Sequence, residues 1–190
     1  MPVVQLATGE RILAAAAEMT AELGWSDVTM AALADRVGVS RQTVYNEWGS
    51  RDRLAEAMVL RELGAFLHEV DAGFDQHPRD LEAGIREAIA RVLALAEVNP
   101  LLRAIVTATH GAETELVPLL TTRADAVIAA ARGRVSECLL SYDGVRRSSV
   151  DVMSDILVRT VLSHVMQPAA DSTRLPSGLA RVATRVLAGA

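Results

Sequence analysis

The feature that most constrains the fold is a closely spaced series of helix stops and helix starts near the N-terminus. The stops are Gly24, Gly38 and Gly49, and the starts are Thr29, Ser40 and Ser50. Glycine favours a helix C-terminus because it adopts left-handed backbone without strain. Serine and threonine favour the N-cap because their hydroxyl oxygens accept from unpaired backbone N–H groups. The spacing predicts short helices over residues 30–37 and 41–48, and a long helix that begins at Arg51.

Apolar residues recur at three- and four-residue intervals along most of the remaining chain, which indicates further amphipathic helices. The apolar content is 51% and the aromatic content only 3%, a composition typical of helix bundles. The additional helices are expected over residues 9–23, 51 to about 73, 79–98, 101–110, 115–140, 145–167 and 176–187. No segment alternates with the two-residue period of a strand. The predicted fold class is therefore all-α, with nine helices.

The helices over residues 30–37 and 41–48 match a helix-turn-helix, in which the second helix enters the major groove of DNA. Its outward side chains suit that role: Gln42 and Asn46 can pair with adenine, and Arg41 with guanine or phosphate. The Thr43 methyl group can contact thymine.

Phosphate contacts are expected at Thr29, Tyr45 and Arg51. Thr29 and Arg51 lie at helix N-termini, where backbone N–H groups and the helix dipole favour an anion. The formal net charge is −5, and acids outnumber arginines in the N-terminal 53 residues. DNA binding must therefore depend on locally oriented donors and not on a basic domain.

From Thr29 to Leu54, the stretch TMAALADRVGVSRQTVYNEWGSRDRL resembles the DNA-binding signature of the TetR family of transcriptional regulators. Val37, Glu47 and Trp48 depart from the usual residues, and Glu47 puts one commonly assigned DNA contact in doubt. With the resemblance, the expected DNA-binding set is Thr29, Arg41, Gln42, Thr43, Tyr45, Asn46, Trp48 and Arg51.

The resemblance implies a helix-turn-helix DNA-binding domain over residues 1–50 and an effector-binding and dimerisation domain over residues 51–190. It implies a homodimer joined through the last two helices, about 145–167 and 176–187. Ligand binding in the body would shift the fourth helix and release double-stranded operator DNA.

A hydrophobic effector, including fatty-acid-like molecules, is expected because the body offers few inward charges to pair with a charged ligand. The candidate lining residues are Phe66, Leu102, Ile105, Val106, His110, Met153 and Leu157. Sequence leaves open whether these residues line a cavity or form plain core. It also leaves open a regulator without an effector, and a helical enzyme or carrier whose N-terminal motif is incidental.

Catalytic, metal and cofactor sites are not expected. The four histidines follow no metal-ligand spacing, and no Gly-x-Ser-x-Gly motif is present. Cys138 is interpreted as a packed thiol, and Arg132 and Arg134 as solvent-facing residues. All 19 basic residues are arginine, which indicates a GC-rich bacterial genome. Without a leader or a long apolar run, a soluble, cytoplasmic protein with no membrane contact is expected.

Overall fold

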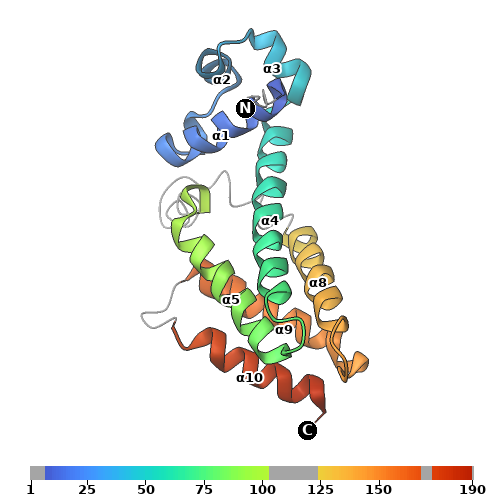
Figure 1. Ribbon diagram of the computed structural model, residues 1–190. Coiled ribbons are helices and arrows are strands. Elements are labelled where there is room, and N and C mark those ends of the chain that lie inside the picture. The colour runs from blue at the N-terminus through green and yellow to red at the C-terminus, as the bar shows by residue number, and fades with distance from the viewer. Residues whose placement is uncertain (1–6, 103–123, 168–172, 190) are drawn as a thin grey trace, which may run out of the picture. The chain divides into compact units, whose positions relative to one another are not determined.

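The computed structural model describes residues 7–102, 124–167 and 173–189. Over these ranges every regular element is helical, which confirms the predicted all-α fold class (Figure 1). The helices are α1 (Thr8–Leu23), η1 (Trp25–Asp27), α2 (Met30–Val37), α3 (Arg41–Trp48), α4 (Arg51–Asp75), α5 (Leu81–Val98), α8 (Ala124–Leu140), α9 (Arg147–Met166) and α10 (Leu175–Ala188). The chain divides into two compact units, residues 1–62 with 99–123 and residues 63–98 with 124–190.

The first unit is built around one apolar core that α1, α2, α3 and the beginning of α4 share. Each of these helices contributes a fully buried side chain, namely Ile12, Leu33, Val44 and Leu54. Leu101, just beyond α5, is buried in the same core. Burial of such side chains contributes about 1.5–3 kcal/mol each. The core therefore holds the two helices of the helix-turn-helix against α1 and α4.

The predicted helix starts are confirmed in the geometry of this unit. The Thr29 hydroxyl oxygen accepts a hydrogen bond from the Ala32 N–H at 3.1 Å. The Ser40 hydroxyl oxygen accepts from the Thr43 N–H at 3.0 Å. Ser50 caps α4 in the same way. Gly38 has φ +75°, a left-handed conformation that a residue with a Cβ rarely adopts. The turn between α2 and α3 therefore depends on glycine.

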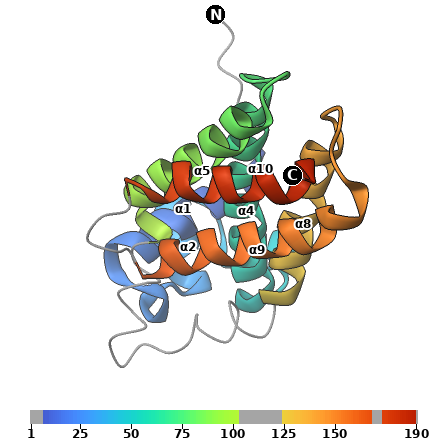
Figure 2. The ribbon, with the colours of Figure 1, turned by 90° about the horizontal axis from the view of Figure 1, so that it is seen from below.

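The second unit packs α5, α8, α9 and α10 with the end of α4. α9 and α10 lie side by side and run in opposite directions (Figure 2). The Arg146 N–H donates to the carbonyl of Leu187 at 2.8 Å and so ties the beginning of α9 to the end of α10. Ile85, Leu139, Val150 and Leu187 are the most deeply buried large side chains of this core.

α4 ends at Asp75, two residues beyond the predicted end at about Gly73. Gly73 marks a close approach of two helices. A Cβ at this residue would lie 2.4 Å from both Cα and N of Ala88 in α5. Glycine is therefore needed here to allow helix packing, a role that the sequence does not predict.

Tyr142 links the end of α4 to the turn after α8. Its hydroxyl contacts the carbonyl oxygens of His77 at 2.7 Å and Phe74 at 3.2 Å. The two aromatic rings of Phe74 and Tyr142 also pack edge to face. Gly84 makes room for this arrangement, because a Cβ there would lie 2.6 Å from the Tyr142 hydroxyl oxygen.

Other helix boundaries differ from the prediction by one or two residues. α5 begins at Leu81 and not at Arg79, because the Asp80 carboxylate accepts from the Ala83 N–H at 3.0 Å and caps the helix. Residues 103–110 and 115–123 of the predicted helices lie outside the described residues. Among the helices that the structure does describe, none has both the length and the apolar character needed to span a membrane.

Candidate nucleic-acid interface

The second helix of the helix-turn-helix, α3, has one buried side chain and a polar surface. Val44 is fully buried in the core of the first unit. Arg41, Gln42, Tyr45 and Asn46 are exposed. Because a buried residue anchors α3 and a side-chain cap fixes its start, these exposed side chains project from a rigid backbone.

The polar side chains of α3 make two local hydrogen bonds. The Gln42 side chain donates from Nε2 to Oδ1 of Asn46, one turn further along, at 2.9 Å. The hydroxyl groups of Ser40 and Thr43 lie 2.8 Å apart and are hydrogen-bonded to each other. The Thr43 hydroxyl is therefore engaged at the helix cap, which leaves the methyl group as its free end.

Thr29 is exposed at the beginning of α2. Its oxygen accepts from Ala32, and a hydroxyl that accepts at a cap keeps its own hydrogen for donation. Thr29 is therefore still equipped to donate a hydrogen bond to a phosphate.

Arg51 is held by the protein itself. Its Nε donates to the carbonyl of Val28 at 2.8 Å, and its NH2 group contacts the carbonyl of Trp25. The guanidinium lies 4.5 Å from the centroid of the Trp25 ring, a cation–π distance. These contacts fix the beginning of α4 against the segment between α1 and α2, and the phosphate contact of Arg51 stays a prediction.

Trp48 is half-buried and packs against the core of the first unit. One of its ring carbons lies 3.9 Å from the point that a Cβ of Gly9 would occupy. Its indole N–H is buried and finds no hydrogen-bond partner among the described residues. These contacts orient Trp48 toward α1.

Glu47 also lies against α1, a contact that the sequence does not predict. Its Oε2 would be 2.9 Å from a Cβ at Gly9, so the carboxylate rests on the first turn of that helix. The helix dipole favours a negative charge at this place. The sequence shows Gly9 at the second residue of α1 and Glu47 near the end of α3, but nothing in the sequence indicates that the two are in contact.

Two arginines tie α1 to α2. Arg11 donates to the carbonyl of Val37 at 2.8 Å, at the end of α2. Arg36 forms an ion pair with Glu22 at 2.8 Å and lowers the pKa of that carboxyl. Both side chains of the ion pair are exposed, so the pair contributes little to stability. The Arg11 contact was missed because it joins residues that are distant in the sequence.

The candidate ligand residues that the structure describes fall in both units, and their role in binding an effector stays a prediction. Met153 and Leu157 are buried in the core of the second unit. Phe66 is half-buried in α4, and Leu102 is half-buried in the first unit. Ile105, Val106 and His110 lie outside the described residues.

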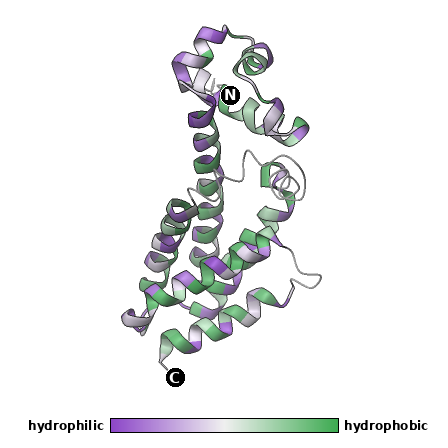
Figure 3. Cartoon of the chain, turned by 180° about the vertical axis from the view of Figure 1, so that it is seen from behind, coloured by the Kyte–Doolittle hydropathy of each residue, from purple (hydrophilic) through white to green (hydrophobic). Residues whose placement is uncertain are grey.

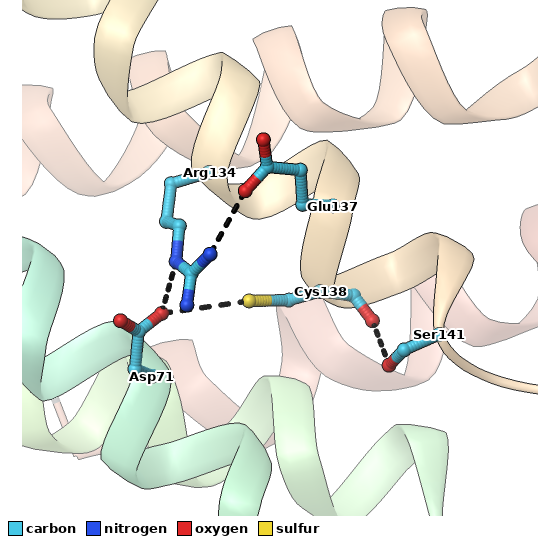
Figure 4. Close-up of polar contacts among 5 residues, drawn as sticks. All are labelled: Asp71, Arg134, Glu137, Cys138 and Ser141. Carbon is cyan, nitrogen blue, oxygen red and sulfur yellow. Dashed lines mark hydrogen bonds and ion pairs between the residues drawn. The ribbon is translucent and has the colours of Figure 1, made fainter.

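A polar cluster joins α4 to α8 in the second unit (Figure 4). Arg134 Nε donates to Oδ1 of Asp71, and its NH1 group donates to Glu137 at 2.8 Å. The thiol of Cys138 lies 3.7 Å from the same Asp71 oxygen. Burial first, and then the charge of Asp71, raise the pKa of Cys138 to about 11. Cys138 therefore remains a thiol near neutral pH, in agreement with its interpretation as a packed residue.

Arg132 and Arg134 are only partly exposed, and both are paired. Arg132 lies 3.3 Å from Asp155, a residue of α9, and Arg134 bridges Asp71 and Glu137. Both side chains reach solvent, as predicted, but they also form ion pairs that the sequence does not predict. Within the described ranges, no group of three or more histidine, cysteine, aspartate or glutamate side chains is arranged to hold a metal ion.

Hydrophobic residues recur along α9 and α10 (Figure 3), and several of their side chains are exposed. On α9, Val152 is 64% and Ile156 is 44% exposed. On α10, Val182 is 57% and Val186 is 44% exposed. Residues four apart lie on the same face of a helix, so each helix presents an apolar stripe to its surroundings.

Comparison with known families gives two matches that together span most of the chain. Residues 12–58 match the model described as "Bacterial regulatory proteins, tetR family". Residues 80–185 match the model described as "Bacterial Tetracyclin repressor, C-terminal domain".

Individual relatives agree with these matches. The chain is 27% identical to the HTH-type transcriptional regulator AlkX of Mycobacterium tuberculosis over 92% of its own length and 82% of that protein. It is 39% identical to an uncharacterised HTH-type transcriptional regulator of Mycobacterium bovis, over 44% of this chain and 42% of the other. The crystal structure of the TetR family repressor AlkX from a Dietzia strain, "implicated in biodegradation of n-alkanes", aligns with a TM-score of 0.75, 28% identity and 97% of each chain.

Proposed function

Because the chain belongs to the TetR family of bacterial regulatory proteins, we propose that it represses transcription by binding a palindromic operator as a homodimer. We further propose that a hydrophobic effector releases the operator. Residues 1–50 would form the DNA-binding domain and residues 51–190 the effector-binding and dimerisation domain. Members of this family are DNA-binding transcriptional regulators, and that coarser description applies to this chain.

The observation that carries the proposal is the construction of α3. Ser40 caps it, Val44 anchors it in the core, and its exposed side chains are those that pair with base edges. The proposed base contacts come from Arg41, Gln42, Thr43 and Asn46. Thr29, at the beginning of α2, and Tyr45, an exposed residue of α3, would contact phosphates. Arg51 and Trp48 complete the proposed DNA-binding set, and their contacts within the protein also position α4 and α1 around α3.

A selection of double-stranded DNA from a random pool tests this function. The proposal predicts an enriched inverted repeat, with half-sites about one helical turn or a multiple of it apart. The control is the Gln42→Ala, Asn46→Ala double variant, which should enrich a different sequence or none. If the unaltered protein enriches no sequence, the proposal of an operator-binding regulator is wrong.

The proposed dimer interface is the apolar face formed by α9 and α10. Its exposed valines and isoleucine would be buried against the same residues of a second copy, as a two-fold interface requires. Val182→Arg places a charge in that interface and is expected to yield monomers with much weaker operator binding. Val98→Arg, at a site that is 72% exposed at the end of α5, is the matched control and should remain dimeric. Sedimentation at micromolar concentration distinguishes the two, and a dimeric Val182→Arg variant would exclude this interface.

The proposed effector carries a hydrocarbon chain. Apolar residues dominate the expected binding region, and a similar repressor is described as implicated in biodegradation of n-alkanes. Titration of the operator complex with n-alkanes, long-chain fatty acids and acyl-CoA tests this. We expect release by a long-chain compound, with a raised melting temperature of the free protein. If only small polar compounds release the operator or stabilise the protein, the proposal of a hydrocarbon-chain effector is wrong.

A second candidate is a regulator without an effector, whose body serves only to dimerise. Met153 and Leu157 favour it, because both are buried among core side chains. In that case no compound in the titration would release the operator, while the DNA selection would still succeed.

A further inference from the structure

α3 carries two amide side chains that are already hydrogen-bonded to each other. Nε2 of Gln42 donates to Oδ1 of Asn46 at 2.9 Å, and both side chains are exposed. The backbone that bears them is fixed by the Ser40 cap and by burial of Val44. The two amides therefore form one preorganised unit on the surface of α3.

This hydrogen bond determines which polar atoms remain for a partner. Gln42 keeps its Oε1 as an acceptor, while Asn46 keeps both hydrogens of Nδ2 as donors. The two residues lie one helical turn apart, but their side chains meet, so an acceptor and a donor are presented side by side. The major-groove edge of adenine offers the complementary pair, a donor at N6 and an acceptor at N7.

Two neighbouring side chains of α3, those of Thr43 and Glu47, are engaged elsewhere. The Thr43 hydroxyl is bound to Ser40 at the cap. The Glu47 carboxylate lies against Gly9 at the beginning of α1. The acceptor of Gln42 and the donors of Asn46 are therefore left to face an external partner.

We propose that Gln42 and Asn46 read the operator as a single unit directed at a purine step that contains adenine. Oε1 of Gln42 accepts from N6 of the adenine, and Nδ2 of Asn46 donates to N7 of that adenine or of the next purine. Each amide restricts the rotation of the other, so less side-chain freedom is lost on binding. This inference rests on the proposed function and adds to it the chemistry that sets sequence preference.

A double-mutant cycle tests the coupling. The unaltered protein, Gln42→Ala, Asn46→Ala and the double variant are titrated against the duplex that the unaltered protein selects, and against duplexes with each base pair changed. Each single substitution is expected to weaken binding about ten- to a hundredfold and to abolish preference at the same purine step. The double variant should bind no more than about threefold more weakly than the poorer single variant, because coupled residues are non-additive.

Asn46→Asp separates base reading from helix stabilisation. Its carboxylate can still accept from Gln42, but it has no hydrogen to donate to a purine N7. The variant is expected to lose the same base preference as Asn46→Ala. A general loss of affinity from the added charge would leave the ratios between duplexes unchanged, so these ratios are the quantity to compare. A pair that only stabilises α3 would retain the original preferences in Asn46→Asp.

The DNA selection tests the proposed function, and the double-mutant cycle tests the coupled reading by Gln42 and Asn46. If the unaltered protein selects no sequence, the proposed function fails and the inference with it. If it selects a sequence but the two alanine substitutions alter different base pairs, with effects that multiply, only the coupled reading is overturned. Tyr45→Phe is the matched control on the same helix, since loss of a phosphate contact should weaken all duplexes equally.

Discussion

Replacement of Gly73 by alanine tests the close packing of α4 on α5. The added Cβ would lie 2.4 Å from Cα and N of Ala88 and 2.9 Å from its Cβ. Carbon atoms in contact are normally about 3.5–4.0 Å apart, so the helices would have to separate by about 1 Å. Two of the three nearest atoms belong to the backbone and cannot rotate away.

The expected magnitude follows from two opposing effects. Overpacking of a core costs about 1–3 kcal/mol, and the rigid backbone of Ala88 puts Gly73→Ala near the upper value. Alanine recovers about 1 kcal/mol through its higher helix propensity. The net destabilisation is therefore about 2 kcal/mol, which lowers the melting temperature of a chain of this size by about 4–8 °C.

Gly64 provides a matched control in the same helix. Apart from its chain neighbours and the backbone of its own helix, no atom of a described residue lies within 4 Å of the point that its Cβ would occupy. Gly64→Ala should therefore gain about 0.5–1 kcal/mol from reduced backbone entropy and melt slightly higher than the unaltered protein.

Thermal unfolding followed by circular dichroism, with all variants at one protein concentration, measures both effects. Opposite signs for the two alanine variants are the expected result. If Gly73→Ala melts as high as Gly64→Ala, the close approach to Ala88 does not constrain the fold, and the packing reason for a glycine at residue 73 is wrong.

Three further predictions concern other contacts. Asn99→Ala removes the acceptor for the Leu102 N–H at 2.8 Å and the donor to Glu62 at 2.6 Å, and should cost about 2–3 kcal/mol in urea unfolding. Glu62→Gln keeps an acceptor and should cost less than about 1 kcal/mol, so equal losses would contradict this account. Glu47→Gln should bind random-sequence duplex about threefold more tightly at low salt, because it removes a negative charge near the phosphates, and the gain should vanish at high salt. Unchanged affinity at low salt would rule this out. With its pKa near 11, Cys138 should react with iodoacetamide at pH 8 about a hundredfold more slowly than an ordinary thiol. Alkylation at pH 8 as fast as that of an ordinary thiol would show that Cys138 is not protected. The same raised pKa leaves the free energy of unfolding unaffected below about pH 9 and lowers it as pH rises toward 11.

Local signals were sufficient for the helix-turn-helix. Thr29, Ser40 and Gly38 act within three or four residues of their own position, so a cap or a turn can be predicted from the sequence around it. The same reasoning applied to the buried face of α3, because Val44 and the exposed Asn46 follow the helical period.

Contacts through space could not be predicted in this way. The need for glycine at residue 73 depends on Ala88, which lies in another helix. The pair of Asp71 and Arg134 joins residues 63 positions apart. Each side chain alone is an ordinary charged residue of an amphipathic helix, so only the fold reveals the partner.

The same limit applies to Arg51. Its place at a helix N-terminus suggested a phosphate contact, yet the ring of Trp25 and the carbonyl of Val28 already hold its guanidinium. Helix position identified a suitable place for an anion, but the tertiary neighbours determine which groups the arginine binds.

If α3 reads base edges in the major groove at two symmetric half-sites, binding must depend on purine N7 atoms in both half-sites. The most direct measurement replaces each purine of the selected duplex, one at a time, by its 7-deaza analogue, which removes the N7 acceptor from the major groove. We predict weakened binding at two clusters of positions, related by a two-fold axis and about one helical turn or a multiple of it apart. Unchanged affinity at every 7-deaza position, with loss of affinity only when the minor-groove N3 is removed, would contradict major-groove reading by α3.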